Sequence, residues 1–227
     1  MPIPTIISIE GNIGAGKTTI ISNLENYILS KYNNEIIFLR EPISVWNTIK
    51  DSNGTILEKF YKDNEKYAFA FQVMAFATRT ENIKNAIKNN PNCKVIICER
   101  SLEADKNVFA KMLKDAGKIE DIQYQIYEHF YNATRGEIDT NAVVYINTNT
   151  KKCLERINKR SRDGENNISI DYLNNCKLYH DNWLINNDKI DVLNLDTSMD
   201  TNYNINNEND CGVMWLKEIE KFILKKN

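Results

Sequence analysis

Short apolar runs alternate along the chain with longer stretches of helical spacing. Runs rich in β-branched residues predict buried strands at 5–9, 35–39, 94–98, 142–146 and 191–195. Apolar residues three and four positions apart predict helices at 19–29, 65–90, 101–115, 119–134, from Thr150, at 169–186 and at 214–224. Residues 43–63 predict two short helices that break at Asn53-Gly54. Residues 198–212, rich in Asn, Asp and Thr, predict a surface loop.

Strands that alternate with helices predict a parallel sheet with helices on both faces. We therefore expect an α/β fold of three layers, built on a five-stranded parallel sheet, in a single domain over residues 1–227. The predicted helix 65–90 is apolar around most of its circumference, so it should be buried on more than one side. Ligands of such sheets bind at the carboxyl ends of the strands. The residues that follow each strand are therefore candidates for chemistry.

The first strand end carries a phosphate-binding motif. Residues 11–18 read Gly-Asn-Ile-Gly-Ala-Gly-Lys-Thr, the G-x-x-x-x-G-K-T pattern of a P-loop, between a predicted strand and a predicted helix. Glycines let successive N–H groups point at one anion, and the helix N-terminus adds positive charge. Lys17 is expected to reach the β- and γ-phosphates, and Thr18 to face Mg²⁺. A glycine-rich turn without a ligand is the alternative. The expected phosphate-binding residues are Gly11, Asn12, Gly14, Ala15, Gly16, Lys17, Thr18 and Thr19.

Charged residues follow the second and third predicted strands. Glu41 can take a proton from an attacking hydroxyl or bind Mg²⁺. Glu99 is expected to help hold Mg²⁺, and Arg100 to stabilise charge on a transferred phosphoryl group. The alternatives are an ordinary surface glutamate for Glu41 and a salt-bridged strand end for the other two residues.

Three arginines precede an Asp-Gly-Glu segment at 163–165 late in the chain. Arg156 and Arg160 are four residues apart and share a helical face, and Arg162 follows them. Guanidinium groups beside a P-loop can close over phosphates, so we expect an Arg-rich lid at about residues 156–167. The alternative is a solvated charged surface.

Composition and charge narrow the class of protein. The formal net charge is −2 without an evident basic face, so a nucleic-acid polymer is not an expected partner. No apolar run approaches transmembrane length, so no membrane association is expected, and the first apolar run is interpreted as a strand rather than a signal. Five cysteines without a C-x-x-C pair suggest neither a disulfide framework nor a zinc site, and favour the cytoplasm. His129 and His180 lie in predicted helices away from every motif, and no role is assigned to them.

Several motifs, taken in order, resemble the deoxyribonucleoside kinase family that contains deoxycytidine, deoxyguanosine and deoxyadenosine kinases. The segment from Ile7 to Thr18 is close to the P-loop segment of that family. Glu41-Pro42 followed by Trp46 matches its E-P-x-x-x-W motif, and residues 99–101 match its E-R-S motif. The segment from Arg156 to Glu165 matches its lid. The resemblance covers nearly the whole chain.

The same resemblance implies roles for individual residues. Glu41 would be the general base, because a primary 5′-hydroxyl is a poor nucleophile until its proton is removed. Glu165 would contact the sugar 3′-hydroxyl. Gln72 offers a donor and an acceptor together to a base edge. Further residues that match the pocket are Tyr61 for the sugar, and Trp46, Phe71 and Phe109 as flat faces for stacking, with plain core packing as the alternative for the two phenylalanines.

Arg79 and Asp105 bear on substrate choice. Arg79 lies seven residues beyond Gln72, two helical turns along the same face. The pair resembles the Arg/Asp pair of cytidine- and purine-preferring members, whereas thymidine-preferring members lack it. The resemblance therefore implies deoxycytidine, deoxyadenosine or deoxyguanosine as substrate. A purely structural salt bridge is the alternative.

The leading hypothesis is an ATP-dependent kinase for the 5′-hydroxyl of deoxyribonucleosides, with Mg²⁺ held through Thr18 and Glu99. The resemblance also implies a homodimer that includes helices 65–90 and 119–134, and inhibition by deoxynucleoside triphosphates. A thymidylate kinase is the second hypothesis, because residues 40–42 resemble the R-E-P segment of those enzymes. A nucleotide-binding regulator that has lost catalysis is the third, and the intact Lys17, Glu41 and Arg100 argue against it.

Overall fold

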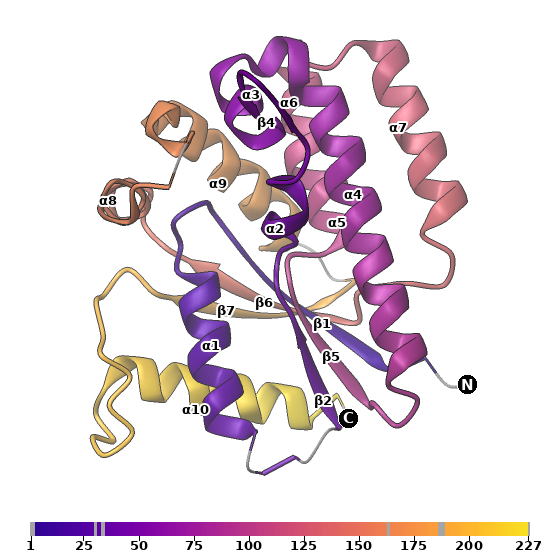
Figure 1. Cartoon of the computed structure of the whole chain (residues 1–227). Coiled ribbons are helices and arrows are strands. Elements are labelled where there is room, and N and C mark those ends of the chain that lie inside the picture. Colours follow the sequence, from indigo (N-terminus) through magenta and orange to yellow (C-terminus); the bar gives the residue numbers. More distant parts are fainter. Residues whose placement is uncertain (1–2, 30, 33–34, 163, 186–188, 227) are drawn as a thin grey trace.

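A five-stranded parallel sheet forms the centre of the protein. The computed structural model describes residues 3–29, 31–32, 35–162, 164–185 and 189–226. The strand order is β2-β5-β1-β6-β7, as can be followed in Figure 1. The strands are β1 (Thr5–Gly11), β2 (Ile36–Leu39), β5 (Val95–Glu99), β6 (Ala142–Asn147) and β7 (Asp191–Asp196). The predicted α/β fold with a parallel sheet is confirmed.

Helices cover both faces of this sheet. The α-helices are α1 (Lys17–Ile28), α2 (Ile43–Trp46), α3 (Ile56–Lys62), α4 (Asn64–Asn89), α5 (Leu102–Ala104), α6 (Lys111–Asp115), α7 (Asp121–Thr134), α8 (Thr150–Arg160), α9 (Ile170–Leu184) and α10 (Cys211–Leu224). A π-helical turn, η1 (Asp105–Ala110), joins α5 to α6, and a 3₁₀ turn, η2 (Glu165–Asn167), precedes α9. Among the residues that the structure describes, no helix combines the length and the hydrophobicity of a transmembrane span.

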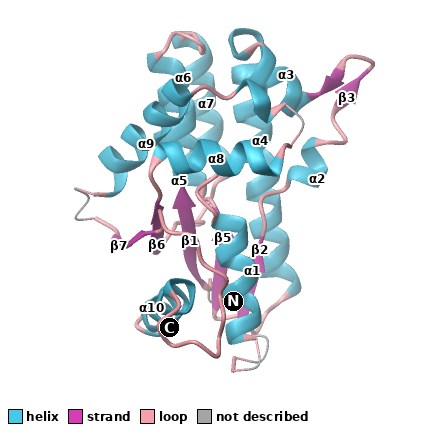
Figure 2. Ribbon diagram, turned by 90° about the vertical axis from the view of Figure 1, so that its left-hand side faces the viewer, coloured by secondary structure: helices cyan, strands magenta, loops and turns pink. Residues whose placement is uncertain are grey.

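Side chains of β1 alternate between the two faces, as the period of a strand requires. Ile7 and Ile9 pack in one core cluster with residues of α1 and α10, whereas Ile6 packs in another with residues of α4 and α7. Figure 1 shows these two pairs of helices on opposite sides of the sheet. Figure 2 shows α8 lying above the end of β1, where it covers the edge at which the strands finish.

The strand register decides which residues meet at that edge. In β1 and β5, Ile9 is paired with Glu99, and in β2 and β5, Leu39 is paired with Cys98. The residues that follow these strands therefore emerge side by side, next to the loop after Gly11. This is the physical basis on which the three strand ends form one site.

The structure differs from the predicted elements in several places. Residues 43–63 contain a short antiparallel hairpin, β3 (Lys50–Asp51) and β4 (Gly54–Thr55), between the two short helices. The predicted helix 101–115 is interrupted by η1, and the last helix begins at Cys211 rather than at Met214. The helix predicted from Thr150 runs through Arg160, so part of the expected charged segment is helical. Asp163 of the predicted lid and position 186 of a predicted helix lie outside the described residues.

Candidate active site

The P-loop joins β1 to α1 through glycines in backbone conformations that other residues rarely adopt. Gly11, Gly14 and Gly16 have φ angles of 148°, 75° and 99°. A Cβ atom on Gly14 would lie 2.4 Å from the carbonyl oxygen of Cys153 in α8. Glycine is therefore required at this position both for backbone conformation and for the close approach of α8.

The side chain of Lys17 is buried at the start of α1. Its Nζ donates to the carbonyl oxygens of Gly11 at 3.1 Å and Asn12 at 2.8 Å. Burial lowers the pKa of Lys17 to about 8, and the charge of Arg100 acts in the same direction. Three carboxylates oppose this shift in pKa, those of Glu99, Glu41 and Glu10. Lys17 is thus a cation held by backbone carbonyls with no carboxylate hydrogen-bonded to it among the described residues.

Thr18 and Glu99 place two oxygen ligands together. The Thr18 hydroxyl donates to Oε1 of Glu99 at 2.6 Å, across the gap between α1 and the end of β5. Hydroxyl and carboxylate oxygens are the ligand type that Mg²⁺ prefers. The described residues contain no group of three or more His, Cys, Asp or Glu side chains that could hold a metal without help from a ligand.

Glu41 lies between two arginines at the end of β2. Its Oε1 is 3.3 Å from Nη2 of Arg79 and 3.2 Å from Nε of Arg100. Burial disfavours the ionised form of Glu41, but the charges of Arg100, Arg79 and Lys17 outweigh it and lower the pKa of Glu41. The carboxylate is therefore ionised at neutral pH and can accept a proton.

Arg79 also forms a buried ion pair with Asp105. Its Nε donates to Oδ2 of Asp105 at 2.9 Å and its Nη2 reaches Oδ1 at 3.3 Å, while Nη1 donates to the backbone oxygen of Glu99 at 2.8 Å. Arg79 and Asp105 are 3% and 2% exposed, so the pair depends on these hydrogen bonds rather than on water. All three guanidinium nitrogens of Arg79 have acceptors, which fixes the side chain in the wall of the site.

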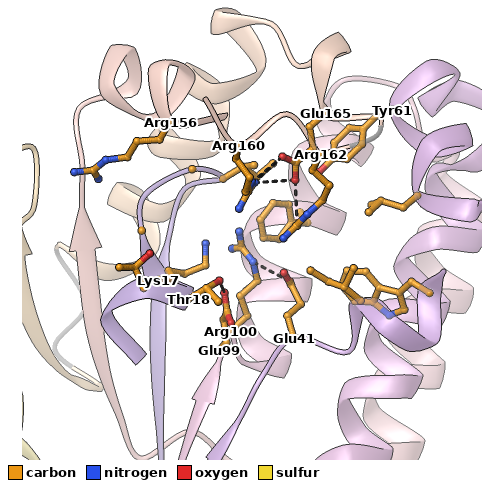
Figure 3. A pocket seen from close by; sticks show the side chains of 18 of the residues that line it. Lys17, Thr18, Glu41, Tyr61, Glu99, Arg100, Arg156, Arg160, Arg162 and Glu165 are labelled. Carbon is orange, nitrogen blue, oxygen red and sulfur yellow. Dashed lines mark hydrogen bonds and ion pairs between the residues drawn. The ribbon is translucent and has the colours of Figure 1, made fainter. Parts of the chain in front are cut away.

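Arg100 occupies a left-handed backbone conformation, with φ of 67°. A residue with a side chain pays about 1–2 kcal/mol for this conformation. The turn directs the buried guanidinium toward Glu41 and over the ring of Phe109, 4.5 Å from the ring centroid. Nη1 of Arg100 has no hydrogen-bond partner among the described residues. Figure 3 shows Arg100 facing the open part of the site between Lys17 and Glu41.

These charges lie in a cavity of about 440 Å³, one side of which is lined by aromatic residues. Phe71 meets Trp46 edge-on at 5.3 Å and stacks on Phe60 at 4.5 Å. The Trp46 indole N–H donates to Thr78, which orients that ring. Gln72, 2% exposed, lines the same cavity, and its Oε1 has no partner in the described part of the chain. Flat apolar walls with one amide suit a planar heterocycle.

The arginines of the predicted lid divide into two groups. Arg160 binds Glu165 through Nη2 at 2.6 Å, and Arg162 approaches the same carboxylate at 3.2 Å. Arg156 instead donates to the backbone oxygens of Ala15, Thr197 and Met199. In Figure 3, Arg160 and Arg162 point toward Glu165, and Arg156 points away from them.

The sequence matches the family model for deoxynucleoside kinase over residues 7–223. The chain belongs to the deoxynucleoside kinase family. Members of this family are ATP-dependent nucleoside kinases, so the protein is a phosphotransferase of that class. The family assignment and the expectation of an enzyme are thereby confirmed.

Several relatives of the chain are named as deoxycytidine kinases. A Fowlpox virus protein named probable deoxycytidine kinase is 36% identical over 185 residues, which cover 81% of this chain and 73% of that protein. Deoxycytidine kinase 2 of Gallus gallus is 30% identical, covering 96% of this chain and 89% of its own length. Human deoxycytidine kinase is 25% identical, with coverages of 79% and 75%. These deoxynucleoside kinase relatives match along most of their length.

Most of the predicted site residues of this deoxynucleoside kinase line one cavity. They are Gly14, Gly16, Lys17, Thr18, Thr19, Glu41, Trp46, Tyr61, Phe71, Gln72, Arg79, Glu99, Arg100, Asp105, Phe109, Arg156, Arg160, Arg162 and Glu165. Gly11, Asn12 and Ala15 are not among the residues that line it. The first two hold Lys17 through their carbonyls, and the carbonyl of Ala15 accepts from Thr148 and Arg156. The chemical roles of these residues stay predictions.

Sequence reasoning missed other residues that line the cavity. On the aromatic side they are Ile43, Leu57, Phe60, Ala75 and Tyr172, and near Arg156 they are Lys152, Glu155, Lys159, Asp200, Thr201 and Tyr203. Phe60 could have been suspected from its place beside Tyr61. The others carry no signal beyond ordinary helix patterning or membership of the Asn-rich loop.

The interpretation of His180 as distant from every motif was wrong. Its ring lies 5.9 Å from the ring of Phe109, one of the residues that line the cavity. The two residues are far apart in the sequence and meet because α9 packs on η1. His129, in contrast, is exposed on α7.

Proposed function

We propose that this deoxynucleoside kinase transfers the γ-phosphate of ATP to the 5′-hydroxyl of deoxyribonucleosides, and favours deoxycytidine and purine deoxynucleosides over thymidine. The observation that carries the proposal is Glu41, ionised between Arg79 and Arg100, at the junction of the aromatic cavity and the P-loop. A base at this junction can reach a hydroxyl on one side while phosphates occupy the other.

Glu41 acts as the general base in this proposal. Its carboxylate takes the proton of the 5′-hydroxyl as the oxygen attacks the γ-phosphorus of ATP. The bond between the γ-phosphorus and the bridging oxygen breaks, and ADP leaves with the electron pair. The lowered pKa of Glu41 supports this role, because the base must be unprotonated before the transfer.

Lys17 and Arg100 stabilise the charge that develops on the phosphoryl group. Lys17 is held at the P-loop by two carbonyls. Nη1 of Arg100, which no described residue binds, faces the same space. Such preorganised cations are effective in phosphoryl transfer because they need little rearrangement as charge shifts. Arg156, Arg160 and Arg162 of the proposed lid add to this positive surface once phosphates bind.

Mg²⁺ is the proposed metal, and the oxygens of Thr18 and Glu99 fit it. The two groups are already adjacent, at 2.6 Å, and Mg²⁺ in kinases takes one or two protein ligands with phosphates and water completing its shell. When bound, the ion neutralises phosphate charge. Thr18 and Glu99 orient that shell from the ends of α1 and β5.

The acceptor pocket supports recognition of a nucleoside. Trp46, Phe71 and Phe109 offer faces or edges to a base, and Gln72 offers its amide to the hydrogen-bonding edge of that base. Tyr61 and Glu165 are assigned to the sugar hydroxyls. Both line the cavity on the side of the lid.

Arg79 and Asp105 support a preference among nucleobases. This buried charged pair lines the cavity, and polar atoms in that wall would disfavour a base that carried an apolar 5-methyl group against them. The relatives named deoxycytidine kinase support deoxycytidine as one of these substrates. We also infer a single domain, a homodimer and a cytoplasmic location, which follow from the family resemblance and from the cysteine pattern.

An ADP-release assay with ATP and Mg²⁺ tests the proposal, with deoxycytidine, deoxyadenosine, deoxyguanosine, thymidine and dTMP offered separately. Turnover on the first three, with little on thymidine, is the expected result. Strong turnover of thymidine would overturn the proposed preference among nucleobases, but the proposal that the protein is a nucleoside kinase would stand. Turnover on dTMP alone would identify a thymidylate kinase, and no turnover on any acceptor would favour a non-catalytic regulator.

A further inference from the structure

The side of Phe109 that faces away from the cavity packs against α9. Phe109 belongs to a cluster with Val108, Met112 and Cys176, is 8% exposed and lines the cavity. His180, which is fully buried, meets this ring edge-on, with ring centroids 5.9 Å apart and an interplanar angle of 84°. An edge-to-face pair of this geometry favours one orientation of both rings.

The His180 ring is itself held from two sides. Nδ1 lies 2.6 Å from the carbonyl oxygen of Cys176, and since a carbonyl only accepts, Nδ1 carries the proton. The ring is parallel to that of Tyr145, at 4° and 6.0 Å, and Tyr145 donates its hydroxyl to Asp181 at 2.6 Å. The orientation of the imidazole is therefore set by α9 and β6, outside the cavity.

His180 is also electrically neutral in this position. Burial lowers the pKa of His180 well below its usual value, and the charge of Arg100 lowers it further. A neutral ring behind Phe109 adds no positive charge to a site that already holds Lys17, Arg79 and Arg100. The contact between His180 and Phe109 is thus the same across the physiological pH range.

We propose that His180 is a positioning residue, which fixes the Phe109 ring and through it the nucleoside site. The inference rests on the proposed function, because it takes Phe109 to contact the base. Phe109 stands on the π-helical turn η1, with Arg100 against its face and His180 at the edge contact. Without the imidazole the ring gains freedom, and a bound nucleoside must remove that freedom again. Loss of the imidazole is therefore expected to weaken binding of the nucleoside without weakening binding of ATP.

Steady-state kinetics on the full chain test this inference, with deoxycytidine varied at saturating ATP and ATP varied at saturating deoxycytidine. His180→Gln keeps the volume and an N–H donor but removes the ring, and we expect it to raise KM for deoxycytidine about five- to twenty-fold. KM for ATP should stay within two-fold of the wild type. His180→Phe restores a ring edge and should recover most of the deoxycytidine KM. Lys221→Gln, which introduces the same side chain at an exposed position of α10, is the control and should change neither constant.

Thermal melting establishes that each variant folds, and His180→Met replaces His180→Gln if the latter does not. An unchanged KM for deoxycytidine in the ring-free variant would overturn the positioning role. A parallel rise in both KM values would also overturn it, because it would indicate a general loss of structure. If the wild type phosphorylates no nucleoside, the proposed function fails instead, so the two failures are distinguishable.

Discussion

Arg79 bridges Asp105 and Glu41, two acids that arise from different elements of the fold. Its Nε is 2.9 Å from Asp105, and its Nη2 is 3.3 Å from Glu41. The guanidinium of Arg79 thus links Asp105, which is assigned to the choice of nucleobase, with Glu41, which is assigned to removal of the proton. A change at Arg79 is therefore expected to affect both substrate choice and turnover.

Removal of the buried pair should change substrate preference. The double variant Arg79→Met/Asp105→Ala removes both charges of the pair and leaves Glu41 with Arg100 as its partner. Loss of Arg79 or Asp105 alone would leave a buried charge without its partner and cost about 3–5 kcal/mol of stability. We expect the ratio of kcat/KM for thymidine to that for deoxycytidine to rise at least tenfold, measured by ADP release. The control is Arg135→Met/Asp139→Ala, which removes an exposed ion pair and should leave the ratio unchanged. If the ratio did not change in Arg79→Met/Asp105→Ala, the role of the buried pair would be structural only, without an effect on substrate preference.

Loss of the proposed base should affect turnover rather than binding. Glu41→Gln keeps the shape of the side chain and removes its capacity to accept the proton, so kcat should fall at least about a hundredfold. Isothermal titration should give a deoxycytidine affinity within a few-fold of the wild type. Glu25→Gln, which breaks an ion pair with Arg40 at a more exposed position, is the control. Near-normal turnover in Glu41→Gln would mean that another group takes the proton.

Activity should depend on pH through Lys17. The pKa of Lys17 is lowered to about 8, and phosphate binding needs its protonated form, so kcat/KM for ATP should fall as the pH rises through about 8. The pKa of Glu41 is lowered, so no loss from this base is expected until the pH falls below its ordinary value of 4.5. A profile of kcat/KM between pH 5 and pH 10 measures the alkaline fall, and it should show no acid limb in this range.

The same shift in pKa acts on stability with the opposite sign. Unfolded Lys17 keeps a pKa near 10.5, so between about 8 and 10.5 the unfolded state binds more protons than the folded state. The contribution of Lys17 to the free energy of unfolding therefore rises with pH in this window. Melting curves without nucleotide separate the two effects, since a loss of activity caused by unfolding would be accompanied by a lower melting temperature.

Gly14→Ala should disrupt the contact between the P-loop and α8. The added Cβ would lie 2.4 Å from the backbone of Cys153, so α8 or the loop must move, and overpacking of this kind costs about 1–3 kcal/mol. We expect KM for ATP to rise at least tenfold. Gly117→Ala is the matched control, because Gly117 also has positive φ, of 68°, but a Cβ there meets nothing within 4 Å. It should lower stability by about 1–2 kcal/mol and leave KM for ATP unchanged. Equal kinetic effects in both variants would contradict the steric argument.

Much of the site could be predicted because its parts follow strands. The P-loop, Glu41 and Glu99-Arg100 each come directly after a short apolar run, and parallel strands end at one edge. These patterns are local, so the periodicity and the motif spacing of the sequence are enough to predict them. The hairpin formed by β3 and β4 and the π-helical turn η1 were missed, because they depend on small local preferences that the flanking helix patterns obscured.

What the sequence by itself determined is therefore the order of the elements, the parallel sheet and the residues at its carboxyl edge. What only the tertiary structure decided is the set of contacts between distant segments. Arg79 reaches Glu41 across the site, Arg156 binds the backbone of the P-loop and the loop after β7, and His180 supports Phe109. Each contact depends on how two helices or loops pack against the sheet. Packing depends on the shapes of many side chains together, so it cannot be predicted from the spacing of residues along the chain.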